Sequence, residues 1–120
     1  MDKLLIRIST IGILSAVVLA GCGGSVPPPH DEWAAAQAEV GRAQQGGAAD
    51  VPDAKLHMQL AQENLQKAKA LIDDDNERAT SLTQLARVEA TLALSLAKAS
   101  KAESEALKAK QDLQKVKAGN

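Results

Sequence analysis

The sequence has no phenylalanine and no tyrosine, and it has one tryptophan and one cysteine among its 120 residues. Without large aromatic rings, a core must be built from aliphatic side chains and alanine, and it will be thin. A deep apolar pocket for a small-molecule substrate is therefore not expected. The single cysteine, Cys22, excludes an intramolecular disulfide and a zinc site built on several cysteines.

Signatures of catalysis and of metal binding are also missing. The chain has no Gly-x-Ser-x-Gly elbow and no glycine loop that would hold a phosphate. Asp73, Asp75 and Glu77 have the spacing of the first ligands of a calcium loop, but Arg78 and Gln84 stand where such a loop needs glycine and glutamate. An acidic turn that caps a helix is the better interpretation. We therefore expect no enzymatic activity, no metal and no cofactor.

Three ring-bearing residues have ordinary interpretations. His30 and His57 are far from each other and from the cysteine in sequence, which favours surface histidines over metal ligands. Trp33 is in helical step with Ala36 and Val40, and this spacing favours packing in a bundle over an anchor for a partner.

The charge of the chain is close to balance, at −1 over the full sequence. Loss of residues 1–21 would change it to −2, so nucleic acid is not an expected partner. From Lys98 onward, however, the chain has six lysines and only three acidic residues. We interpret this lysine-rich stretch as a solvated helix face in which opposite charges pair along the helix, and an anion-binding tail is the alternative.

The first 21 residues have the layout of a secretory signal peptide. Lys3 and Arg7 precede an apolar run over residues 8–19, which small residues close. The run is shorter than the roughly 20 apolar residues that a membrane-spanning helix needs. The sequence therefore predicts export and removal of this leader.

The leader ends in Leu19-Ala20-Gly21-Cys22, which resembles the lipobox of bacterial lipoproteins. The resemblance implies a diacylglyceryl group on the Cys22 thiol and cleavage between Gly21 and Cys22. Two or three acyl chains hold a protein on a membrane almost permanently. Gly23 follows the cysteine, and by the same resemblance it points to the outer membrane, with the chain facing the periplasm.

Residues 22–30 read as a tether, because glycine and proline dominate them and they offer little apolar surface. Residues 31–118 consist mainly of strong helix formers without strand-like alternation. Gly46-Gly47 and the acidic turn at residues 73–77 divide this stretch into helices at about 31–45, 51–72 and 76–117. The second helix begins where Asp50 resembles a cap, with Pro52 inside the first turn.

Apolar residues at alternating steps of three and four predict an all-α fold, with an antiparallel hairpin formed by the second and third helices. The seam of the second helix comprises Val51, Ala54, Met58, Ala61, Leu65, Ala68 and Ile72, widened by Leu56, Leu60 and Leu71. The seam of the third helix begins with Leu85, Val88, Leu92 and Ser95, widened by Leu82, Ala86, Ala93 and Leu94. It continues beyond the reach of the second helix as Ala99, Ala102, Ala106, Ala109, Leu113 and Val116. A second copy or another helical partner would cover this continuation, and a solvated extension is the alternative.

The helical region resembles the domain of unknown function 4398 family of alanine-rich bacterial lipoproteins. The residues that carry the resemblance are Pro52, Leu56, Ala61, Leu65, Ala68, the turn at 73–77, Ala79, Leu82, Ala86, Glu89, Ala90, Ala93 and Ala97. The resemblance implies a helical hairpin in the periplasm and brings no catalytic residues. We expect a structural or scaffolding element of the cell envelope, and an adaptor that docks on another envelope protein is the alternative.

Overall fold

The computed structural model describes residues 24–119, and within them it contains helices and no strand. The helices are α1 (His30–Gln45), α2 (Pro52–Leu71) and α3 (Asn76–Ala118), and a short 3-10 helix, η1 (Ala48–Asp50), joins α1 to α2. The all-α fold predicted from the sequence is confirmed. Each long helix begins and ends within one residue of its expected range.

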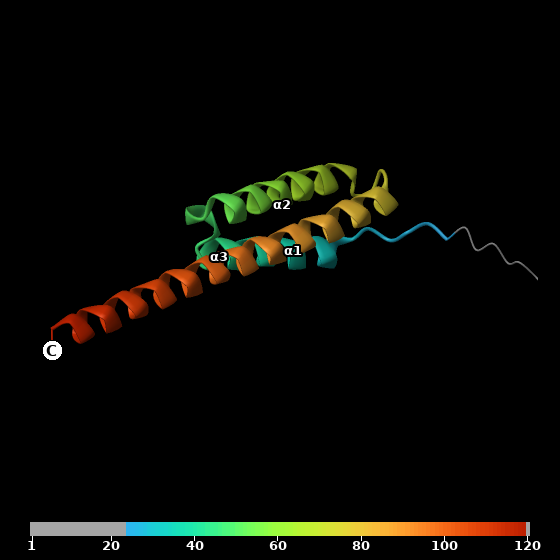
Figure 1. The fold of residues 1–120 in the computed structure, drawn as a ribbon. Helices are drawn as coiled ribbons and strands as arrows, with labels where there is room; N and C mark the ends of the chain where they lie inside the picture. Colours follow the sequence, from blue (N-terminus) through green and yellow to red (C-terminus); the bar gives the residue numbers. More distant parts are fainter. Residues whose placement is uncertain (1–23, 120) are drawn as a thin grey trace, which may run out of the picture.

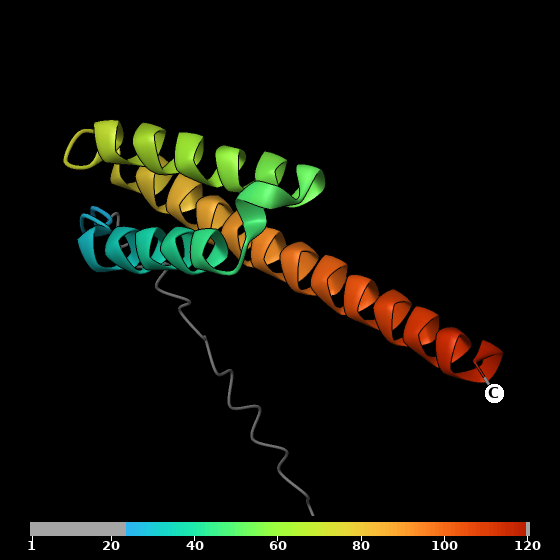
Figure 2. The same ribbon diagram turned by 90° about the vertical axis from the view of Figure 1, so that its left-hand side faces the viewer.

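The first half of α3 packs against both other helices, and its second half projects beyond them (Figure 1). Helix α2 runs antiparallel to α3 and makes the larger set of contacts with it, whereas α1 lies along α3 in the same direction (Figure 2). The predicted hairpin with a short first helix and a long third helix is therefore present. Its packed part ends near residue 97, after which every described residue except Ser100 is exposed.

Local sequence explains most of the helix ends. Gly46 caps α1, and Gly47 follows in the left-handed region at φ 87°, which glycine adopts without strain. Pro52 occupies the first position of α2, where its missing N–H costs nothing. The Oδ1 atom of Asp75 accepts a hydrogen bond from the Arg78 N–H at 3.1 Å, which caps α3. The expected cap by Asp50 is wrong, because Asp50 lies in η1 and Val51 stands at the cap position without a side-chain bond.

The predicted seam of α2 is the center of the core. Its buried members are Ala54, Met58, Ala61, Leu65 and Ala68. Helix α1 contributes Ala36, Val40 and Ala43 from its own heptad line. The prediction that Leu56 widens the α2 seam is wrong, because Leu56 is 54% exposed. Leu60 and Leu71, predicted for the same role, are half-buried.

The predicted seam in the first half of α3 is also wrong. Leu85, Val88 and Leu92 are exposed at 46%, 64% and 39%. The side facing α1 and α2, which we call the inner face of α3, consists of Ala79, Thr83, Ala86, Ala90, Ala93 and Ala97. Small side chains let three helix axes approach closely, and the bulkier leucine line would hold them apart. Ala86 and Ala93, which the sequence places beside the seam, are therefore central members of the inner face.

Candidate functional surface

The exposed leucine line of α3 and its continuation form one surface. We call it the outer face of α3, and its members are Leu85, Val88, Leu92, Ser95, Ala99, Ala102, Ala106, Ala109, Leu113 and Val116. All ten are exposed. At 3.6 residues per turn they lie roughly opposite the inner face, so α1 and α2 leave them uncovered. The six tail residues predicted as a partner seam thus belong to a longer surface that begins at Leu85.

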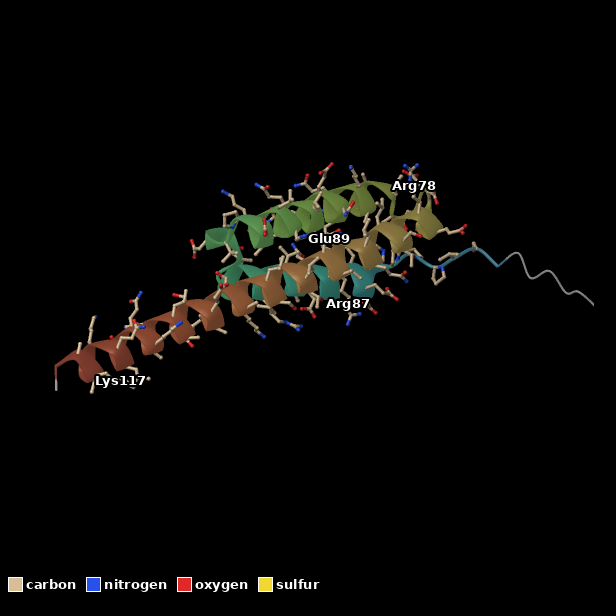
Figure 3. All side chains as sticks on the ribbon, viewed as in Figure 1. Arg78, Arg87, Glu89 and Lys117 are labelled. Atoms are coloured by element: carbon tan, nitrogen blue, oxygen red, sulfur yellow. The ribbon has the colours of Figure 1, made fainter. Side chains whose placement is uncertain are left out.

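On the packed half of α3, the outer face includes a shallow and mostly apolar hollow. Val88 and Leu92 line it together with Arg87, Thr91 and Ser95. The Arg87 side chain extends from α3 away from α2 (Figure 3). The hollow is open to solvent and lacks the enclosure of a small-molecule site, so it suits contact with a protein surface.

The tail of α3, residues 98–118, carries six of its nine charged residues on the two flanks of the outer face. Lys98, Glu105 and Asp112 follow one flank. Glu103, Lys110 and Lys117 follow the other flank, and Figure 3 shows Lys117 near the far end of α3. One of these six residues forms an ion pair within the described chain: Asp112 Oδ1 lies 3.7 Å from Nζ of Lys115, and both side chains are exposed. Exposed pairs of this kind contribute little to stability.

His57 is not the surface histidine that the sequence predicts. Its Nδ1 atom lies 2.6 Å from Oε2 of Glu89, and both side chains are partly buried between α2 and α3. Figure 3 labels Glu89 on the packed half of α3. The pair joins residues 32 positions apart, so no local pattern indicates it. It is a polar contact between α2 and α3 beside an interface built mainly of apolar residues, and it suits one register of the hairpin.

Trp33 packs in the bundle, as its spacing predicts. The ring lies against the core, and its Nε1 donates a hydrogen bond to the Leu65 carbonyl at 2.9 Å. The Lys69 ammonium lies 5.5 Å from the ring center, at a distance that suits a cation–π contact. Trp33 is therefore a link between α1 and α2, and its polar atom is occupied inside the chain.

The acidic turn at residues 73–77 forms the cap that the sequence favours. Asp73 has φ 77°, and its N–H donates to Asn76 Oδ1 at 2.9 Å. Across residues 24–119, no group of three or more histidine, cysteine or acidic side chains is arranged to hold a metal ion. On α2, a hydrogen bond from Lys67 and its positive charge lower the pKa of the exposed Glu63 carboxyl.

The leader, the cleavage site at Gly21 and the lipidation site at Cys22 lie outside the described residues. The first described residues contact the bundle at one end: Asn76 Nδ2 donates to the Val26 carbonyl at 2.9 Å, and Pro29 is buried. The chain therefore enters the bundle beside the turn between α2 and α3. The far end of α3 lies at the opposite end of the molecule (Figure 1). In the described part of the chain, no helix has the length and apolar character of a membrane span.

Comparison with known proteins identifies the helical region. The sequence model of a family described as Domain of unknown function (DUF4398) matches residues 31–109. The chain belongs to this family. No curated protein and no solved structure matches the chain. The DUF4398 match covers α1, α2 and α3 as far as Ala109, so eight of the ten outer-face residues lie within it.

Proposed function

We propose that this DUF4398 protein is a lipid-anchored, periplasm-facing scaffold of the bacterial outer membrane that acts by contact and not by catalysis. The lipobox-like Leu19-Ala20-Gly21-Cys22 supports the anchor. The long and unpacked tail of α3 supports the scaffolding role.

The entry point of the chain sets the direction of the scaffold. Cys22 precedes Val26 by four residues, and Val26 is bonded beside the α2–α3 turn. A lipid on Cys22 would therefore attach near this end of the bundle. Helix α3 begins at the same end and is about 65 Å long, so its tail would extend away from the membrane into the periplasm.

The observation that carries the proposal is the outer face itself. A helix that packs against nothing gains little stability, because most helical stability in proteins comes from burial of an apolar face. The tail of α3 nevertheless keeps alanine, leucine or valine at the first and fourth position of every heptad through Val116. Such a surface is suited to burial against another protein. The same observation serves the second candidate, an adaptor on another envelope protein, which the apolar hollow at Val88 and Leu92 favours.

Lipidation at Cys22 is tested by growing cells with a palmitate analogue that can be detected after purification of the protein. We expect label on the unmodified chain and none on Cys22→Ser, because the thiol is the acceptor of the first lipid. Ser25→Ala, a change three residues away, is the control and should keep full label. Equal label on Cys22→Ser would contradict the anchor. Separation of inner and outer membranes then locates the labelled protein.

A further inference from the structure

We propose that the outer face of α3 pairs with the same face of a second copy of this chain, in parallel and in register. The partner of the proposed scaffold would then be a second copy of the same chain. It is argued from α3 alone and does not require that Cys22 be lipidated.

The spacing of the outer face is that of a two-stranded coiled coil. Steps of three and four alternate without a break from Leu85 to Val116, over about four and a half heptads. Leucine or valine occupies the first three and the last two positions, and Ser95 and four alanines lie between them. Alanines allow two helices to approach closely, and the larger ends supply apolar area. Neither α1 nor α2 obstructs this face, because both pack on the inner face.

The charges on the two flanks select the partner and its direction. In the heptad of the outer face, Ala99, Ala106 and Leu113 are first positions. In a parallel pair, the residue just before a first position faces the residue five places further along in the other helix. Lys98 then faces Glu103 of the second copy, Glu105 faces Lys110, and Asp112 faces Lys117. All three contacts join opposite charges, and symmetry repeats each of them on the other side of the pair.

An antiparallel pair is less complementary, because it places each flank against itself. A pair centered on the tail still joins Lys98 to Asp112, but it brings Glu105 near Glu105 and Glu103 near Glu103 of the second copy. Like charges at such positions oppose association. The flanks therefore favour the parallel arrangement, in which both chains enter their bundles at the same end of the dimer.

Cysteine crosslinking of the purified full chain tests the pairing, with Cys22→Ser as the background so that the result is independent of lipidation. In a parallel and in-register pair, residue 102 faces its own copy at the center of the seam. Ala102→Cys should therefore form a disulfide-linked dimer under mild oxidation. Ser104→Cys lies on the opposite side of the same turn and should remain monomeric, which makes it the matched control.

Reversal of the flanking charges tests the direction with the same readout. In the Ala102→Cys chain, Glu103→Lys with Lys110→Glu and Lys117→Glu turns every cross-chain contact into a repulsion. We expect self-association to weaken about a hundredfold, since six exposed pairs each change by a fraction of a kcal/mol. Adding Lys98→Glu, Glu105→Lys and Asp112→Lys to the same chain makes all contacts attractive again. This chain should regain the dimer.

The rescue separates pairing from folding. If the three reversals acted by damaging the fold, the chain with six reversals would be damaged at least as much and would not regain the dimer. The urea midpoint of the three-helix bundle, followed by circular dichroism, should be equal in all variants, because the reversed residues lie in the tail beyond the packed part. Three results would overturn the proposal: no dimer from Ala102→Cys, equal dimer from Ser104→Cys, or dimer formation that ignores the charge reversals. None of them bears on the labelling of Cys22, so failure of the pairing and failure of the anchor are distinguishable.

Discussion

Replacement of Leu65 by alanine is expected to lower the free energy of unfolding by about 2 to 5 kcal/mol. Leu65 is 5% exposed and is the largest aliphatic side chain in a core that otherwise consists mostly of alanine. Its neighbours are helices fixed by small residues, which cannot move inward to fill the space that it leaves. Because small domains are stable by about 5 to 15 kcal/mol, this loss is a large fraction of the total.

Thermal and urea unfolding followed by circular dichroism measures this loss. Leu56→Ala is the matched control, since it is the same substitution on the same helix at a residue that is 54% exposed. The control should change stability by no more than about 0.5 kcal/mol. Equal midpoints for Leu65→Ala and the unmodified chain would show that α2 does not pack on α3 as described.

The second large effect is expected from Ala90→Leu on the inner face of α3. Ala90 is fully buried where α3 meets the other helices. The larger side chain must either displace a helix or adopt a strained rotamer, at a cost of about 1 to 3 kcal/mol. The helix propensities of alanine and leucine are similar, so the effect comes from packing.

The same substitution at an exposed position separates packing from propensity. Ala35 on α1 is exposed, and Ala35→Leu should leave the urea midpoint nearly unchanged. If Ala90→Leu were neutral or stabilising, the inner face would have room for a large side chain. The predicted leucine seam would then be the better description of the core.

The sequence predicts the helices well because their ends depend on local chemistry. Gly47 adopts the left-handed backbone of the turn without strain, Pro52 fits a first helical turn, and the Asp75 side chain caps α3. The core of α2 is also predictable, since one apolar line at heptad spacing dominates that helix. The exception is Asp50, which forms a 3-10 turn before Val51 and does not cap α2.

The two faces of α3 could not be assigned from sequence, for a physical reason. Its alanine line and its leucine line have the same heptad spacing, so periodicity alone does not tell which one is buried. Close packing against two helices selects the smaller side chains, and that depends on where α1 lies. The sequence predicts one line from Leu85 to Val116 and an uncovered tail past the end of α2, but it does not predict that the first half of this line is exposed. The contact between His57 and Glu89 was missed because it crosses 32 residues.

The central claim, that an exported chain presents the outer face of α3 to a protein, is tested most directly by photo-crosslinking in intact cells. A photoreactive amino acid at position 113 lies on the outer face, whereas one at Gln111 is also exposed and lies on the opposite side of the tail. We predict a crosslinked product from position 113 and none from position 111. Its mass identifies a second copy or another envelope protein. No product from position 113, or equal products from both positions, would contradict the claim.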